Sequence, residues 1–237
     1  MKRDLRKRDD GKSKFKNQKS RSYFLFLIYL MINWLNERTG IIDKIRGQLT
    51  YPVPSHVNFW FCFGGFAFFL IVLQVLSGVF MMFFYVPIAE NAQASIKYLC
   101  NNIPYGGLIR NFHRWSATLI VAFLFIHTVN VITRRAYKGP RELNWWSGIL
   151  LFLLMFLFMG TGIILPWDWR SYWELIVWAD WFGTIPIIGE HLIIPLISAF
   201  TIGKSFVIHV WILPAVVLFI LIFHLRMVRR LGIAEPL

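Results

Sequence analysis

Four runs of apolar residues, separated by shorter polar links, dominate the hydropathy pattern of the chain. A helix that crosses a bilayer core about 30 Å thick needs about 20 predominantly apolar residues. Each of the four runs is long enough, so the pattern predicts an all-α membrane protein with four transmembrane helices. The runs extend approximately from Asn58 to Tyr85, from Leu108 to Ile132, from Trp145 to Leu165 and from Ser205 to Val228.

The chain ahead of the first run divides into two segments of different character. Residues 1–22 hold ten Lys and Arg against three Asp and predict a disordered basic tail. Residues 23–50 begin with the apolar stretch YFLFLIYLMI, as in a signal peptide, but no small-residue cleavage site follows it. Because residues of mixed polarity follow instead, this segment is predicted to be an amphipathic helix lying in the membrane interface. Residues 51–237 then form the four-helix domain.

The formal net charge of +13 is concentrated in the tail and in the links on one side of the predicted bundle. The link after the second run and the exit of the fourth run are basic, whereas the other two links together hold five acidic residues against three Lys and Arg. The positive-inside rule therefore places both termini on the cytoplasmic side of a multi-pass membrane protein. Because the basic residues adjoin membrane spans, an anionic lipid surface explains them better than nucleic acid does.

Two of the four runs each contain a pair of histidines. His113 and His127 lie fourteen residues apart in the second run, and His209 and His224 lie fifteen apart in the fourth. A single histidine could be a packed imidazole with a backbone partner, but ionisable groups inside a span are costly and by default mark function. Imidazole is the usual protein ligand of haem iron, and bis-histidine ligation takes one donor from each of two facing helices. The two pairs therefore predict two haem groups.

The spacing of the histidines sets their depth and direction. Fourteen residues span about 21 Å and nearly four helical turns, so His113 and His127 face the same way. Because the second and fourth runs are parallel, His113 pairs with His209 near the outer face, and His127 with His224 near the inner face. The additional residue in the fourth run adds about 100° of rotation and predicts a rotated or skewed inner haem.

Glycines and basic residues near the histidines fit the same interpretation. Two glycines fourteen residues apart in the first and third runs would remove side chains where the haem macrocycles press, although small-residue helix packing is the alternative. These are Gly64, Gly78, Gly148 and Gly162. Nearby cations would pair with haem propionates, unless they only snorkel to the interface. They are Arg110, Arg114, Lys204 and Arg229.

The cysteines and the two remaining histidines indicate no particular function by themselves. Cys62 and Cys100 are the only cysteines, so a disulfide framework or Cys-rich metal site is not expected. From the residues alone, Cys62 is interpreted as a small buried hydrophobe. His56 and His191 lie outside the runs and are predicted to have no special role.

Several motifs together resemble the cytochrome b6 family, the four-helix split form of cytochrome b in quinol-oxidising Rieske/cytochrome b complexes. The motifs are HRWSA, KGPRELNWWSG, GTGIILPWD and RRLGIAEPL, with the histidine spacing of fourteen and then fifteen, and the resemblance runs from Trp34 to Leu237. It implies that His113 and His209 bind the low-potential haem b, and His127 and His224 the high-potential one. It also implies a single thioether bond from Cys62 to a third haem, of the c type, and no role for Cys100.

The resemblance further implies an electron-transfer subunit that oxidises quinol on the outer side and reduces quinone on the inner side, coupled to proton translocation. The expected partners are a Rieske iron–sulfur protein, a separate three-helix subunit, a c-type cytochrome, lipid and a second copy of the chain. The expected location is a bacterial cytoplasmic or intracellular energy-transducing membrane. Two departures from the family pattern affect the quinone sites. Arg46 and Gly47 occupy positions where acids are common, and the segment from Asp168 to His209 is shorter.

Two other functions share part of this pattern. A dihaem b membrane anchor of a periplasmic dehydrogenase would use the same histidine pairs, but it does not predict HRWSA, LPWD or Cys62. A transporter or channel that relays protons through its histidines would need no iron. A companion Rieske protein argues against the first alternative, and Soret absorption argues against the second.

Overall fold

The computed structural model describes residues 2–50, 52, 54–189, 191, 197–198 and 201–233, with the side chains of residues 2–17, 20, 48 and 49 left out of the description. All the regular structure among these residues is helical. The chain forms two compact units, residues 1–54 and 55–237, which are described separately. Part of the segment between Asp168 and His209, and the end of the RRLGIAEPL motif, lie outside the described residues.

The first unit contains two helices, α1 (Lys2–Thr39) and α2 (Ile41–Leu49), and differs from the prediction. Residues 2–22, predicted to be a disordered tail, are helical. Lys and Arg are good helix formers and this segment has no proline, so its charge did not exclude a helix. The predicted helix over 23–50 is broken at Gly40, whose φ of +62° suits glycine. Asn36 supports the corner, because its Oδ1 accepts hydrogen bonds from the amides of Ile42 and Asp43.

The two helices also divide the predicted amphipathic character between them. Nearly all the large apolar side chains from Tyr23 to Leu35 are exposed, and they surround α1 instead of following one side. In α2 the apolar residues gather on one side, as an interfacial helix requires. The interfacial location of this unit therefore remains a prediction that α2 fits better than α1.

The second unit is a bundle built from the four predicted spans, which confirms the predicted fold class. Each span is a helix long and apolar enough to cross a membrane, and the boundaries agree with the prediction to within a few residues, except at the start of the first span. The last span is one rod made of α9, a π-helical turn η2 and α10, from Ile202 to Leu231. The elements of the bundle are η1 (Phe59–Phe61), α3 (Phe63–Met82), α5 (Gly106–Thr133), α6 (Glu142–Ile164), α9 (Ile202–Val207), η2 (Ile208–Ile212) and α10 (Leu213–Leu231).

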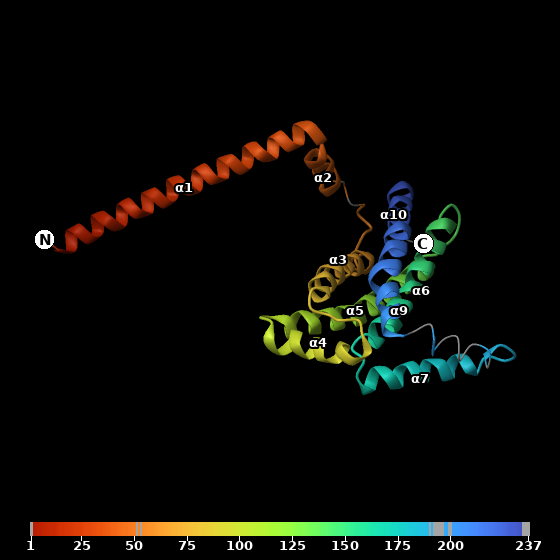
Figure 1. Cartoon of the computed structure of the whole chain (residues 1–237). Helices are drawn as coiled ribbons and strands as arrows, with labels where there is room; N and C mark the ends of the chain where they lie inside the picture. The colour runs from red at the N-terminus through yellow and green to blue at the C-terminus, as the bar shows by residue number, and fades with distance from the viewer. Residues whose placement is uncertain are drawn as a thin grey trace. The chain divides into compact units, whose positions relative to one another are not determined.

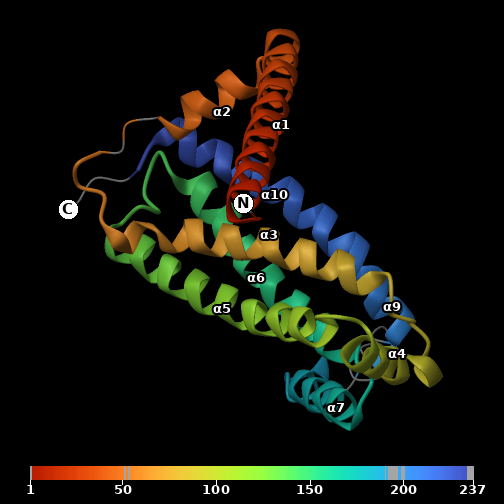
Figure 2. The same ribbon diagram turned by 90° about the vertical axis from the view of Figure 1, so that its left-hand side faces the viewer.

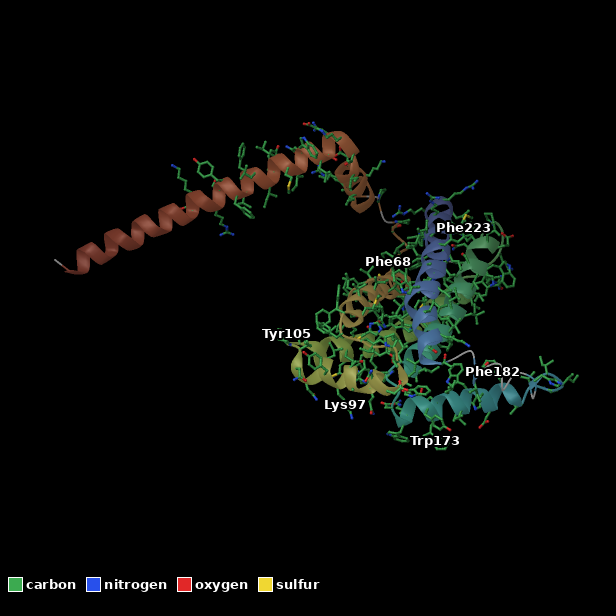
Figure 3. All side chains as sticks on the ribbon, in the orientation of Figure 1. Phe68, Lys97, Tyr105, Trp173, Phe182 and Phe223 are labelled. Carbon is green, nitrogen blue, oxygen red and sulfur yellow. The ribbon has the colours of Figure 1, made fainter. Side chains whose placement is uncertain are left out.

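The bundle is organised as two helix pairs, seen along their length in Figure 2. Helix α3 packs along α5, α6 packs along α10, and α5 contacts α6 between the pairs. The buried hydrophobic cluster lies at mid-depth: Ile120 is seven residues from both His113 and His127 along α5, and it packs with residues of α6 and α10. Large apolar side chains such as Phe68 and Phe223 project outward (Figure 3), as lipid contact requires. The core therefore separates two levels of the bundle.

Two surface helices, α4 (Ala89–Asn102) and α7 (Trp169–Gly183), were not predicted. They occupy the links after α3 and α6, at the same end of the bundle (Figure 1). Their signal is present in the sequence, because the buried residues of α7, Ser171, Leu175 and Ala179, recur every four residues. Asp168 caps α7, since its carboxylate accepts a hydrogen bond of 2.9 Å from the amide of Ser171. Hydropathy alone missed both helices because they are too polar to cross a membrane.

Candidate haem site

Each of the four bundle histidines lies against one glycine of a neighbouring helix. The glycines of α3 face the histidines of α5, and the glycines of α6 face those of η2 and α10. A Cβ added at Gly162 would lie 2.8 Å from Cε1 of His209, closer than real Cβ contacts allow. The pairs are Gly64 with His127, Gly78 with His113, Gly148 with His224 and Gly162 with His209. These glycines therefore make room for the imidazole rings, and the expectation that they also make room for the macrocycles stays a prediction.

Hydroxyl groups hold three of the four imidazole rings by their Nδ1 atoms. The oxygen–nitrogen distances are 2.8 Å from Ser77 to His113, 2.9 Å from Ser147 to His224 and 3.0 Å from Thr161 to His209. In each case the hydroxyl belongs to the residue just before the glycine that faces the same ring. Sequence reasoning missed these partners, although the repeated Ser-Gly or Thr-Gly pair was a usable signal. The Nδ1 atom of His127 is buried and has no partner among the residues that the structure describes.

His113 and His209, the predicted outer pair, have about the separation that two ligands of one haem iron require. The ring centres of His113 and His209 are 6.5 Å apart. Two metal–imidazole bonds of about 2 Å each, with the ring radius added at both ends, make about 6 Å. Within the described part of the chain, no three His, Cys, Asp or Glu side chains form a cluster that could hold a metal ion. His127 lies close enough to His224 to affect it electrostatically, so the four histidines form two pairs, each suited to hold one haem iron.

The rotation predicted for the inner haem assumed a regular α-helix from His209 to His224, and this assumption is wrong, because a π-helical turn absorbs the additional residue. His209 lies within η2, where each turn takes one residue more than in an α-helix. Fifteen residues of this rod therefore cover the rotation of fourteen in α5. Accordingly, His209 and His224 both face α6, at Gly162 and Gly148, which are themselves fourteen residues apart.

The four predicted propionate partners have varied environments. Arg110 is half-buried and lies close enough to Asp168 to affect that carboxylate electrostatically, whereas Arg114 is exposed. Lys204 is exposed, and its Nζ donates a hydrogen bond of 2.8 Å to the carbonyl of Ser198. Arg229 lies near the end of α10 and is exposed. Their role toward haem propionates stays a prediction.

At the predicted inner end, Cys62 stands at the boundary between η1 and α3. Its side chain is exposed, not buried as the residues alone suggested, while Cys100 is half-buried. Beside it, the guanidinium of Arg134 lies 4.0 Å from the ring centre of Phe61, and His56 packs edge-on against the same ring. His191 is exposed. The thiol of Cys62 is thus accessible for covalent attachment.

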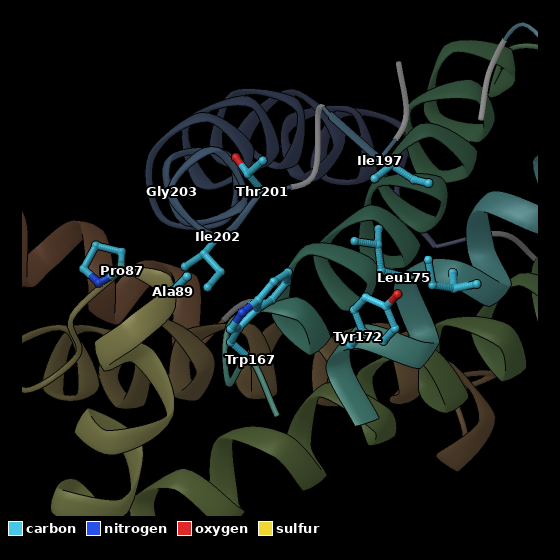
Figure 4. A pocket seen from close by; sticks show the side chains of 10 residues that line it. Pro87, Ala89, Trp167, Tyr172, Leu175, Ile197, Thr201, Ile202 and Gly203 are labelled. Carbon is cyan, nitrogen blue, oxygen red and sulfur yellow. The ribbon is translucent and has the colours of Figure 1, made fainter. Parts of the chain in front are cut away.

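A cavity of about 410 Å³ lies at the opposite end, where α4 and α7 cover the bundle (Figure 4). Its walls are mainly apolar and come from both links and from the start of the last span, including Pro87, Trp167, Tyr172 and Ile202. Ile202 precedes His209 by seven residues, about two helical turns or 10 Å. The cavity therefore belongs to the level of His113 and His209, and sequence reasoning did not locate it.

Comparison with known proteins agrees with this geometry. Residues 48–232 match the family model described as Cytochrome b/b6/petB. The chain is 38% identical over 220 residues to the menaquinol:cytochrome c reductase cytochrome b subunit of Geobacillus thermodenitrificans, covering 87% of this chain and 98% of that protein. It is 37% identical over 213 residues to cytochrome b6 of Heliobacterium modesticaldum, covering 87% of this chain and 100% of that protein.

A solved structure has the same fold. The chain is similar to a chain of a hyperthermophilic respiratory Complex III, with a TM-score of 0.76 and 31% sequence identity. The similarity covers 85% of this chain and 55% of the solved one.

Proposed function

The chain belongs to the cytochrome b/b6 family, and we propose that it is the electron-transfer subunit of a quinol-oxidising complex of the bc1 or b6f type. The observation that carries the proposal is the set of four histidines, paired on facing helices at two depths, each against its own glycine. A dihaem anchor and a proton-relaying transporter would not account for the match of residues 48–232 to this family.

His113 and His209 would hold the outer, low-potential haem b, and His127 and His224 the inner, high-potential one. When bound, each haem accepts and releases one electron at a time. The chain fixes the four imidazoles, and its glycines leave room for them. The apolar layer around Ile120 and Met155 separates the two levels and keeps water out of the route between them. This arrangement supports an electron path across the membrane, with both termini on the cytoplasmic side.

The cavity near Trp167 and Tyr172 would form this chain's share of the outer quinol site. Its apolar walls suit a quinol ring, and its position two turns from His209 suits electron transfer to the outer haem. Relatives are named as menaquinol:cytochrome c reductase subunits, which supports a quinol substrate and a c-type cytochrome as acceptor. The Rieske protein would take one electron from the quinol and this chain the other. A three-helix partner subunit would complete the site, and the complex would be a homodimer.

Cys62 would carry a c-type haem near the inner quinone site. The attachment would add the Sγ–H of Cys62 across one haem vinyl group, which would form a single thioether without a redox step. The exposed thiol at the start of α3, close to the level of His127, supports this assignment. Arg46 and Gly47 stand where members of the family often carry acids, so these two positions do not supply an acidic proton route to reduced quinone.

The haem content of the purified subunit tests the proposal. A pyridine haemochrome assay should give two extractable haems b per chain. A bis-histidine EPR spectrum should identify the ligands. A chain with no Soret absorption, or with one haem b only, would contradict the proposed function.

A further inference from the structure

The hydrogen bonds to the axial histidines are distributed unequally between the two haem levels. At the outer level both rings are held by a hydroxyl, Ser77 for His113 and Thr161 for His209. At the inner level only His224 is held, by Ser147, because Nδ1 of His127 is buried without a partner in the described part of the chain. The outer pair therefore has two such hydrogen bonds and the inner pair has one.

The direction of these hydrogen bonds follows from what else each hydroxyl does. The hydroxyl of Thr161 donates its proton to the carbonyl of Leu157, at 2.8 Å. Ser77 and Ser147 likewise donate to carbonyls of their own helices. Since a hydroxyl has one proton, its oxygen is left to accept from the imidazole Nδ1–H. Nε2 is then the unprotonated nitrogen of the ring, and it is free to bind iron.

The missing hydrogen bond traces to one residue, Phe63. The three hydroxyl residues each precede the glycine that faces the same ring, and Phe63 precedes Gly64 in the same way. Phe63 lies fourteen residues before Ser77 on α3, and therefore on the same face of that helix. Its side chain is only 8% exposed, and its ring packs against Phe123 of α5. An aromatic ring cannot accept the proton as a hydroxyl oxygen does.

This inference rests on the proposed function. We propose that the unequal hydrogen bonding of the histidines helps to make the reduction potential of the outer haem lower than that of the inner haem. A histidine that donates its Nδ1–H becomes a more basic ligand. A more basic ligand stabilises the oxidised iron, which has the extra positive charge, and so lowers the reduction potential. Two such bonds lower the outer potential more than one lowers the inner potential. The hydroxyl residues are therefore positioning residues: Ser77, Thr161 and Ser147. Phe63 keeps the reduction potential of the inner haem high, which favours electron transfer from the outer haem to the inner one.

The experiment is a potentiometric titration of both haems b in the purified complex, with EPR spectra of the oxidised haems. Thr161→Val keeps the shape of the side chain and removes the hydroxyl, so the outer potential should rise while the inner one stays. Ser147→Ala should raise the inner potential. Phe63→Thr should lower the inner potential relative to Phe63→Val, which creates the same space without an acceptor.

The results separate this inference from the function on which it rests. If the wild-type complex lacks two haems b, the proposed function fails. If both haems are bound but Thr161→Val and Ser147→Ala leave the potentials unchanged, the inference is overturned. Equal inner potentials in Phe63→Thr and Phe63→Val would overturn the role of Phe63. Because the readout is a potential and a spectrum, a merely structural role for these residues would not produce the expected pattern.

Discussion

Tyr85 donates a hydrogen bond of 2.6 Å from its hydroxyl to the carbonyl of Leu165, across 80 residues of sequence. The bond joins the chain just beyond α3 to the chain just beyond α6. The Tyr85 ring also packs against Phe206 of α9, at 5.6 Å between ring centres. Three of the four spans are thus connected at one point, beside the cavity that α4 and α7 cover.

Tyr85→Phe should weaken this end of the bundle while keeping the ring contact. Loss of a hydrogen bond of this kind costs about 1 kcal/mol of stability. The variant should unfold at a lower temperature when followed by Soret absorption, with both haems still bound at room temperature. Tyr98→Phe, at an exposed position on α4, is the matched control and should change nothing.

Gly162→Ala should remove the outer haem selectively. The new Cβ would lie 2.8 Å from Cε1 of His209 and would push the ring out of place. Gly160→Ala, two residues earlier on the same helix, meets nothing within 4 Å and should bind both haems. A haemochrome assay should give one haem b for the first variant and two for the second. Equal haem content in both would contradict the close fit between glycine and imidazole.

His127→Leu should remove the inner haem b and leave the outer one. Quinol oxidation should then stall after about one turnover, because the electron that enters the outer haem has no acceptor further inward. Stopped-flow spectra should show rapid reduction of the outer haem followed by a very slow steady state. His191→Leu changes an exposed histidine and should not affect turnover. Undiminished steady-state turnover in His127→Leu would rule out the two-haem path.

Cys62→Val should abolish haem staining of the subunit on a denaturing gel, while both extractable haems b remain. Cys100→Val is the matched control, because it removes the other thiol and should keep the stained band. The wild-type band is expected near 28 kDa, given a chain mass of 27.9 kDa. A wild-type gel without haem staining would remove the assignment of Cys62 and leave that of the four histidines intact.

Asp168 should make the stability of α7 depend on pH. Burial raises the pKa of this carboxyl, but hydrogen bonds from Ser171 and the charge of Arg110 outweigh that effect and leave the pKa below its usual value. A depressed pKa means that the carboxylate contributes stability at pH values above its ordinary pKa of 3.8, and that this contribution is lost as the pH falls through the lower, folded-state value.

Hydrogen exchange in α7 measures the effect of this cap. Asp168→Ala should speed exchange at the start of the helix at neutral pH, by the equivalent of about 1 kcal/mol. In the wild type the same protection should fade at acidic pH, and in the variant the loss should be smaller, because only the Arg170–Glu174 ion pair then remains to titrate at the start of the helix. Asp180→Ala, at an exposed position of the same helix, should retain the wild-type pH dependence.

The bundle and its histidine pairs could be predicted because hydropathy and a fourteen-residue period are properties of the sequence itself. The residues that contact these histidines could be predicted only in part. Gly162 was found by its spacing, but its close contact with the ring of His209 was not predicted. Thr161 was missed because a hydroxyl in an apolar helix is usually satisfied by its own backbone, so the repeated Ser-Gly or Thr-Gly pair was not connected with the histidines.

The N-terminal unit and the surface helices were harder to predict for a different reason. The first part of α1, residues 2–22, was expected to be disordered because high charge and low hydrophobicity predict disorder, yet the same Lys and Arg residues are good helix formers. Helix α7 carries its apolar residues at a helical period, but this pattern is weak beside four long apolar runs.

Because of the π-helical turn at His209, the last span holds one additional residue without turning its later side chains to another face. A one-residue insertion normally turns every later side chain by about 100°, so that lipid-facing residues would point inward and ligands outward. Here η2 confines the insertion to a single turn, and the residues of α10 keep the orientation that a shorter helix would give them. The number of residues between two ligands can therefore differ by one among related chains while the ligands keep the same orientation. The condition is that a π-helical turn is gained or lost together with the residue.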